Sequence, residues 1–227
     1  TCYDAGVHSA CIVRWPGVIK PHSESDALVE YVDIVPTFID IAGGKPIAPV
    51  DGKSFKNVLT GKEKTHKQYT FSLQTTRGIY KGSPYYGIRS VSDGRYRYIV
   101  NLTPEAKFQN TEVFSPLFKQ WETKGETDKH AWEMTHKYQY RPAIELYDVE
   151  KDPYCMKNLA DDPNYKTKIN ELDKQLKGWM KYCGDEGQET EMDALNHLAS
   201  NLQKDITTKE KKNNQSTKGK KKRNKKH

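Results

Sequence analysis

The sequence predicts an α/β protein whose C-terminal part is a four-stranded antiparallel sheet packed by a long helix. Three observations indicate this class. Near Tyr69, helical spacing of apolar residues gives way to short runs of β-branched and aromatic residues, which are typical of strands. The pair Asp93-Gly94 separates two of these runs, and Asp-Gly is a strong hairpin signal. Helical spacing then returns from Tyr165 to Tyr182.

The first 68 residues predict a leading strand and two helices of a larger α/β sheet. Residues 11–15, CIVRW, form a short apolar run that Pro16-Gly17 closes, as expected of a buried strand. The stretch SDALVEYVDIVPTFIDIAGG predicts a turn and a helix that has a proline in its first turn and ends at two glycines. A short helix is expected near residues 55–59, and polar residues 61–68 are expected to be a linker.

Four runs predict the strands of the antiparallel sheet. They are QYTFSLQ, YYGIRSVS, YRYIVNL and AIELYDV, which together lie between residues 68 and 149. Residues 104–143 interrupt them as a long, polar, irregular excursion. The Trp and Tyr content of the excursion favours order, and loops of this length are usually functional or disordered.

The charge of the chain is concentrated at its C-terminal end. Residues 209–227 hold ten Lys or Arg and one Glu, a net charge of +9, which leaves about −2 for the first 208 residues of a total of +7. This Lys-rich segment has no apolar residue that could pack, so we expect a disordered tail that binds polyanions without specificity. A specific nucleic-acid function is disfavoured, because such a domain carries its cations on a folded face.

The remaining composition excludes two further classes. No stretch approaches the ~20 apolar residues that a membrane-spanning helix needs. The four cysteines are far apart and form no Cys-x-x-Cys pair, which disfavours a structural zinc site. Cys155 and Cys183 flank a predicted helix, and the sequence leaves open whether they form a disulfide or remain thiols.

Three stretches carry a resemblance to a known family. TCYDAGVHSACIVRWPG followed by YVDIVPTFIDIAG resembles the central part of the sulfatase family, and ELYDVEKDPYCMKNLADDP resembles its C-terminal signature. YYGIRSVSDGRYRYIVNL is most similar to the heparan N-sulfatase (sulfamidase) branch. The resemblance covers residues 1–184. It implies the C-terminal part of an alkaline-phosphatase-like fold and the hydrolysis of sulfate esters or N-sulfates of sulfated carbohydrates.

The resemblance also implies which parts of the catalytic machinery to expect. Sulfatases use a formylglycine made from a C/S-x-P-S/A-R motif, a calcium ion and a sulfate-binding Lys. None of the four cysteines begins such a motif, and no carboxylate cluster resembles a calcium site. We therefore expect a fragment that is inactive by itself, with calcium and formylglycine in a longer parent enzyme. The family implies a periplasmic, extracellular or lysosomal location.

Four residues are candidates for substrate binding, and each has a structural alternative. His8 follows Gly6-Val7, where relatives carry Arg or His beside the pocket, and it either contacts sulfate or sugar or holds its loop. Thr76, Arg77 and Tyr80 belong to the stretch TTRGIY, in which the Arg77 guanidinium could grip a carboxylate or sulfate of a neighbouring sugar. The alternative for Arg77 is a surface salt bridge. No residue of the chain is predicted to be catalytic or to bind metal.

These observations predict three segments. Residues 1–68 are expected to belong to the large α/β domain, residues 69–184 to the antiparallel-sheet subdomain with its long helix, and residues 185–227 to a polar linker and tail. Two other functions remain open: a non-catalytic module that binds carbohydrate or polyanions, and a nucleic-acid-associated protein led by the tail.

Overall fold

The computed structural model describes residues 1–45, 48–75, 82–83 and 85–197. The chain divides into two compact units. One contains residues 1–74, 88–100 and 144–183, and the other contains residues 75–87, 101–143 and the residues from 184 onward. The predicted tail, 209–227, lies outside the described residues. The three-segment division expected above differs from this division and stays a prediction.

The four predicted strands are confirmed and form one antiparallel sheet in the order β1-β2-β3-β4. Thr70 pairs with Ser92 between β1 and β2, and Tyr96 pairs with Asp148 between β3 and β4. The strands are β1 Thr70–Gln74, β2 Ile88–Ser92, β3 Tyr96–Asn101 and β4 Ile144–Asp148.

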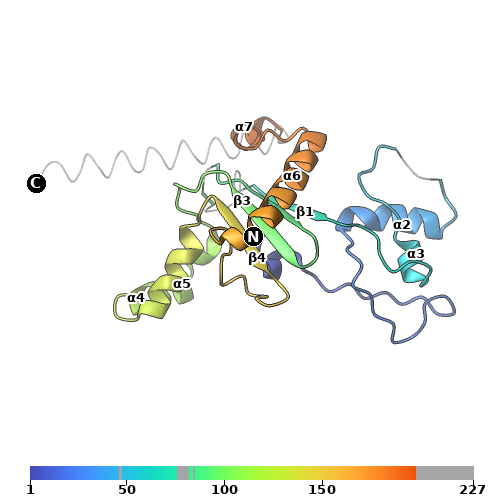
Figure 1. Cartoon of the computed structure of the whole chain (residues 1–227), viewed down its shortest axis with the longest axis horizontal. Coiled ribbons are helices and arrows are strands. Elements are labelled where there is room, and N and C mark those ends of the chain that lie inside the picture. Colours follow the sequence, from blue (N-terminus) through green and yellow to red (C-terminus); the bar gives the residue numbers. More distant parts are fainter. Residues whose placement is uncertain (46–47, 76–81, 84, 198–227) are drawn as a thin grey trace, which may run out of the picture. The chain divides into compact units, whose positions relative to one another are not determined.

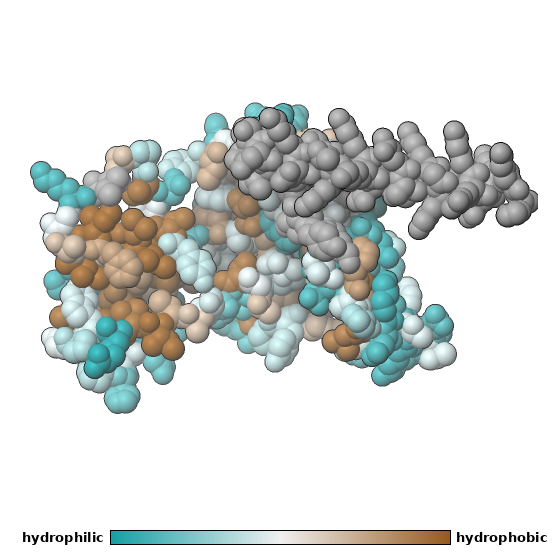
Figure 2. Space-filling model, turned by 180° about the vertical axis from the view of Figure 1, so that it is seen from behind, coloured by the Kyte–Doolittle hydropathy of each residue, from teal (hydrophilic) through white to brown (hydrophobic). Residues whose placement is uncertain are grey.

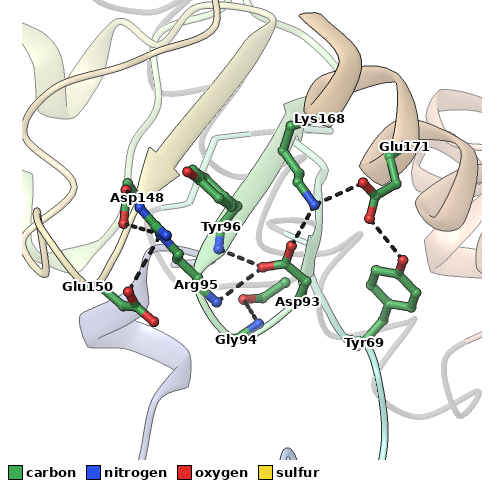
Figure 3. Close-up of polar contacts among 10 residues, drawn as sticks. Tyr69, Asp93, Gly94, Arg95, Tyr96, Asp148, Glu150, Lys168 and Glu171 are labelled. Carbon is green, nitrogen blue, oxygen red and sulfur yellow. Dashed lines mark hydrogen bonds and ion pairs between the residues drawn. The ribbon is translucent and has the colours of Figure 1, made fainter. Parts of the chain in front are cut away.

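The predicted hairpin joins β2 to β3 through Asp93 and Gly94. Gly94 has a φ of +98°, which only glycine adopts without strain. The Asp93 carboxylate accepts hydrogen bonds from the backbone N–H of Arg95 (3.1 Å) and of Tyr96 (2.7 Å). Its second oxygen lies 3.1 Å from the ammonium of Lys168 on the long helix, so the turn is attached to that helix (Figure 3).

The long C-terminal helix is confirmed as α6, Lys166–Cys183, which packs across the sheet (Figure 1). Alternation along the strands places one set of side chains toward α6, and Leu172 and Leu176 of α6 are completely buried against them. The ring of Phe71 stacks on that of Trp179 with centroids 5.1 Å apart. The sheet residues of this core are Val91, Tyr98 and Leu146.

Both helices predicted for the first 68 residues are present. α2, Ile34–Ile41, has Pro36 in its first turn and ends before Gly43, whose φ is +72°. α3, Lys56–Leu59, is a single turn. A short helix α1, Asp4–Val7, precedes them. Shorter 3₁₀ turns lie at Tyr31–Asp33, Thr111–Phe114, Pro163–Tyr165 and Ala194–His197.

The strand predicted at residues 11–15 is wrong. These residues form no strand, and Ile12 is 93% exposed. A β-branched run adopts strand structure only when another strand satisfies its backbone groups, and no strand within the described ranges pairs with it. High strand propensity alone was therefore insufficient to make residues 11–15 a strand.

The excursion 104–143 is more regular than predicted. It contains two helices that pack against each other, α4 Pro116–Lys124 and α5 Lys129–Gln139 (Figure 1). Ser115 caps α4, with a proline at the first helical position, and Asp128 caps α5 by accepting a hydrogen bond from Ala131 N–H. A further short helix, α7 Gln188–Asp193, lies in the segment expected to be a polar linker.

Two smaller expectations concern cysteines and membranes. The cysteines are thiols, with Cys155 buried and Cys183 exposed, and in the described chain no disulfide joins them. Within the same ranges, no helix combines the length and hydropathy required to cross a membrane.

Candidate functional site around His8

The N-terminal segment binds to the sheet face opposite α6. Alternation along β3 and β4 places Arg97, Glu145 and Tyr147 on this face, because Tyr98 and Leu146 point toward α6. All three are at most 7% exposed. Buried charges need partners, and residues of the N-terminal segment supply them.

Tyr3 and Asp4 are the two residues that make this attachment. The Tyr3 hydroxyl donates to the Glu145 carboxylate at 2.9 Å, and the Tyr147 hydroxyl donates to the same carboxylate. Burial and the adjacent Glu145 carboxylate both raise the pKa of Tyr147, so Tyr147 remains a donor. The Asp4 carboxylate accepts a hydrogen bond from Arg97 Nη2 at 2.9 Å.

His8 lies at the exposed end of this network. Its Nδ1 is 3.1 Å from Asp4 Oδ2, while Asp4 Oδ1 faces Arg97. The His8 side chain is 76% exposed, whereas that of Asp4 is 12% exposed. If the imidazole donates from Nδ1 to Asp4, its Nε2 is left toward solvent as a proton acceptor or, after protonation, as a contact for an anion.

The structure describes only one of the four predicted substrate-binding residues. His8 is placed as above, in contact with Asp4. Thr76, Arg77 and Tyr80 lie outside the described residues, so the assignment of all four to substrate binding stays a prediction.

Three residues of this network were not singled out from the sequence. Arg97, Glu145 and Tyr147 form the support beneath the segment that carries His8. A signal was present, since Arg97 and Glu145 alternate with apolar residues in YRYIV and ELYD. That alternation usually indicates that the polar side of the sheet faces solvent. In this structure the N-terminal segment covers the polar side.

A second buried polar cluster surrounds Asp33 at the start of α2. The Asp33 carboxylate lies 2.8 Å from Lys67 Nζ and 3.3 Å from His66 Nε2, and it accepts hydrogen bonds from the backbone N–H of Lys53 and Glu30. The segment 61–68, expected to be a linker, therefore contributes two side chains to a fully buried carboxylate. The short distances and complete burial indicate a structural role.

Neither cluster is suited to hold a metal ion. Among the described residues, no three His, Cys, Asp or Glu side chains converge as ligands. In the network around His8, the carboxylates are occupied by a guanidinium and two phenol hydroxyls. In the cluster around Asp33, a lysine occupies the carboxylate. What this part of the chain offers is hydrogen bonding and one exposed imidazole.

Comparison with known proteins gives consistent matches. Residues 1–113 match the family model of the N-sulphoglucosamine sulphohydrolase C-terminal region. An ulvan-active sulfatase of Formosa agariphila is 35% identical over 185 residues, covering 82% of this chain and 35% of the relative. Human N-sulphoglucosamine sulphohydrolase is 28% identical over 200 residues, covering 73% of this chain and 37% of the relative.

The solved structures show a similar fold. A protein determined in complex with its substrate D-glucosamine-2-N,6-O-disulfate superposes with a TM-score of 0.54 at 22% identity, covering 78% of this chain and 29% of that protein. The chain thus spans about a third of the length of the relatives it matches.

Proposed function

Because the chain belongs to the sulfatase family, we propose that it forms the C-terminal part of an enzyme that hydrolyses sulfate esters or N-sulfates of sulfated carbohydrates. The observation that carries this proposal is the 35% identity to an ulvan-active sulfatase over 185 residues. A match of that length within a chain of 227 residues necessarily includes the antiparallel sheet, which lies between residues 70 and 148. It therefore concerns more than one motif.

We further propose a division of labour within a longer sulfatase. Members of this family attack sulfur with a formylglycine nucleophile and neutralise the sulfate oxygens with calcium. No cysteine of residues 1–227 begins the C/S-x-P-S/A-R motif, and the described side chains form no cation site. We therefore assign the nucleophile and the calcium to a catalytic part of the longer enzyme, and no chemical step to this chain.

The role proposed for this chain is to bind and orient the sugar. His8, Thr76, Arg77 and Tyr80 are proposed to line the substrate pocket. Support for His8 comes from its contact with Asp4, which in turn binds Arg97. The buried Asp4 carboxylate orients one imidazole nitrogen of His8, and the other nitrogen stays accessible. A preoriented side chain loses less conformational entropy when it binds an anionic substrate.

Two further parts of the proposal follow from the relatives. Their printed names include activity toward ulvan and N-sulphoglucosamine, so we propose a sulfated polysaccharide or glycosaminoglycan as the substrate class. We also propose a periplasmic, extracellular or lysosomal location, in which such polymers are degraded. The Lys-rich tail is proposed to bind polyanions without specificity.

The experiment compares the 227-residue chain with the longer enzyme on two substrates, a small aryl sulfate and a sulfated oligosaccharide. We expect no turnover of either substrate by the 227-residue chain and turnover of both by the longer enzyme. Arg77→Ala in the longer enzyme should lower kcat/KM for the oligosaccharide by roughly ten- to a hundred-fold, the effect of one charge-assisted hydrogen bond, and leave the aryl sulfate almost unchanged.

Other results would contradict specific parts of this proposal. Equal losses on both substrates would place Arg77 at the sulfate group, and no loss on either would return it to a surface salt bridge. Turnover of the aryl sulfate by the 227-residue chain would overturn the proposed division of labour.

A further inference from the structure

We propose that the exposed side of α5 binds an anionic sugar residue of the polysaccharide substrate, through three stacked aromatic rings and the ammonium of Lys107. The identity of the ligand rests on the proposed function. The location of the site rests on the geometry of the compact unit that contains α4 and α5.

The aromatic stack consists of Trp132, His136 and Tyr140, which succeed one another at intervals of four residues along one side of α5. The ring centroids of Trp132 and His136 are 4.6 Å apart with planes at 16°, and those of His136 and Tyr140 are 4.5 Å apart with planes at 23°. Mutual stacking restricts all three side chains before any ligand binds, which lowers the entropy lost on binding.

The rings of this stack are exposed to solvent and do not pack in the hydrophobic core. Trp132 is 52% exposed and Tyr140 is 46% exposed. Phe108 of the same unit is instead fully buried, and its ring packs against that of the partly buried Tyr138. An exposed apolar surface with polar neighbours is a common feature of a binding site, and here it borders a groove.

The groove has a volume of about 280 Å³ and lies between α4 and α5. This volume is just below the roughly 300–1,000 Å³ of sites for drug-sized ligands, so it suits about one sugar ring. Beside the aromatic rings it presents the Glu122 carboxylate, which pairs with Lys119 through Oε2 and can accept further hydrogen bonds from hydroxyls. Its lining residues are Glu122, Trp132, Thr135, His136, Gln139 and Tyr140.

Lys107 supplies the positive charge that an anionic sugar needs. Its Nζ lies 5.6 Å from the centroid of the Tyr140 ring, at the end of the stack. Lysines of α4 and α5 such as Lys119 and Lys129 have carboxylate partners, Glu122 and Glu133. Lys107 forms no ion pair with any residue that the structure describes, so its ammonium is available to a sulfate or carboxylate group.

The arrangement favours a sugar over a protein or a nucleic acid. The surface is a groove of one-ring size rather than a flat apolar face, which disfavours a protein interface. The ring faces within the stack are occupied by one another, so they offer no platform for successive bases. A pyranose needs only one exposed aromatic surface, and it can place its C–H groups against Trp132, which is 52% exposed, and its hydroxyls toward the Glu122 carboxylate.

The test is direct binding by the 227-residue chain at fixed ionic strength, with no turnover required. The probes are a sulfated tetrasaccharide prepared from ulvan and the same tetrasaccharide after desulfation. Trp132→Ala and Tyr140→Ala should each raise Kd for both probes about ten-fold, while Trp132→Phe should retain most of the affinity. Lys107→Ala should raise Kd about ten-fold for the sulfated probe alone, because it removes one charge-assisted contact.

Matched variants make the result specific to the groove. Trp121 on α4 is 49% exposed but does not line the groove, and Lys129 is an exposed lysine that pairs with Glu133. Trp121→Ala and Lys129→Ala should bind both probes as the unchanged chain does. Inorganic polyphosphate, which reports binding by the Lys-rich tail, should bind the Trp132→Ala variant with unchanged affinity.

Three results would overturn the inference. They are unchanged binding after Trp132→Ala and Tyr140→Ala, equal weakening by Trp121→Ala, and loss of all tetrasaccharide binding when residues 209–227 alone are removed. None of these measures hydrolysis, so an inactive longer enzyme would contradict the proposed function and leave this inference standing.

Discussion

Asp33 illustrates at the scale of one residue how a buried charge is stabilised. Its side chain is fully buried. Burial by itself raises the pKa of this carboxyl, but hydrogen bonds from the Lys67 ammonium and from the backbone N–H of Lys53 and Glu30 outweigh burial and lower the pKa below its ordinary value. Gly52 makes the Lys53 contact possible, since a Cβ there would lie 1.8 Å from the Val32 carbonyl oxygen.

We expect Asp33→Asn to lower the free energy of unfolding by about 3–5 kcal/mol at neutral pH, the usual cost of breaking a buried ion pair. The lowered pKa also sets a pH dependence. The stabilisation is complete above the unfolded pKa of about 3.9 and is lost as pH falls through the lower folded value. Urea denaturation at pH 7 and at pH 3 measures the free energy of unfolding of both proteins. The difference between Asp33→Asn and the unsubstituted chain should be smaller at pH 3.

Asp40→Asn is the matched control for this prediction. Asp40 also pairs with a lysine, Lys56, but its side chain is 47% exposed. Exposed ion pairs contribute little to stability, so Asp40→Asn should change the free energy of unfolding far less than Asp33→Asn. Equal losses in the two variants would show that burial does not set the strength of the Asp33 contacts.

At the scale of elements, the β2–β3 hairpin is held by ion pairs on both sides (Figure 3). On one side, Arg95 donates from Nε and Nη2 to Asp148 of β4, and the Arg95 contact lowers the pKa of Asp148. On the other side, Lys168 of α6 lies 3.1 Å from Asp93 and 2.8 Å from Glu171. The turn is therefore attached both to the next strand and to the covering helix.

Two glycine substitutions, one in the β2–β3 turn and one in α6, test how backbone conformation and available space determine the effect of an added Cβ on stability. Gly94→Ala should lower the free energy of unfolding by about 1–2 kcal/mol, because Gly94 has a φ of +98° and an alanine there is strained. Gly178→Ala should instead raise it by up to about 1 kcal/mol, because Gly178 lies inside α6, where nothing is within 4 Å of the added Cβ. Thermal or urea unfolding measures both.

Opposite signs for the two substitutions are the essential outcome. A stabilising Gly94→Ala would contradict the assigned turn conformation. A destabilising Gly178→Ala would contradict the open space that surrounds this position of α6.

At the scale of the whole molecule, an apolar face lies on the region that carries α2 (Figure 2). Phe38 is 65% exposed, Val35 is 56% exposed and Val32 is 49% exposed. Val35 and Phe38 are three residues apart on one side of α2, and Val32 lies in the 3₁₀ turn directly before it. Monomeric proteins seldom expose a large contiguous apolar patch without a partner for it. Under the proposed function, this face packs against the catalytic part of the longer sulfatase.

We expect the 227-residue chain to bind the dye ANS and to self-associate through this face. Val35→Ser combined with Phe38→Ser should reduce dye fluorescence and shift the chain toward monomer in sedimentation. In the longer enzyme, the same pair should reduce stability, because these side chains would there be buried. Leu73→Ser, at an exposed residue of β1 (53% exposed), is the control and should change neither property much.

A chain that is monomeric and does not bind ANS would contradict this expectation. So would an unchanged stability of the longer enzyme after the double substitution. Either result would mean that the α2 face is tolerated in solvent.

Most of the secondary structure could be predicted because its signals are local. The alternation in YRYIV, the Asp-Gly pair and the apolar spacing of α6 each lie within one element, and the structure confirms all three elements. The alkaline-phosphatase-like fold class is confirmed as well, by the likeness to a solved structure at a TM-score of 0.54. The misses were residues 11–15, whose propensity lacked a partner strand, and α4 and α5, whose capping signals were not used.

The sequence by itself determined the strands, the hairpin, the long helix and the family, because propensity, turn chemistry and motif similarity depend on neighbouring residues. Only the tertiary structure decided which distant charges meet. Arg97 reaches Asp4 across 93 positions of sequence and Tyr3 reaches Glu145 across 142, and a buried charge takes whichever partner the packing brings near it. The stack of Trp132, His136 and Tyr140 likewise required knowledge that residues 129–139 are helical, since only a helical turn superposes every fourth side chain.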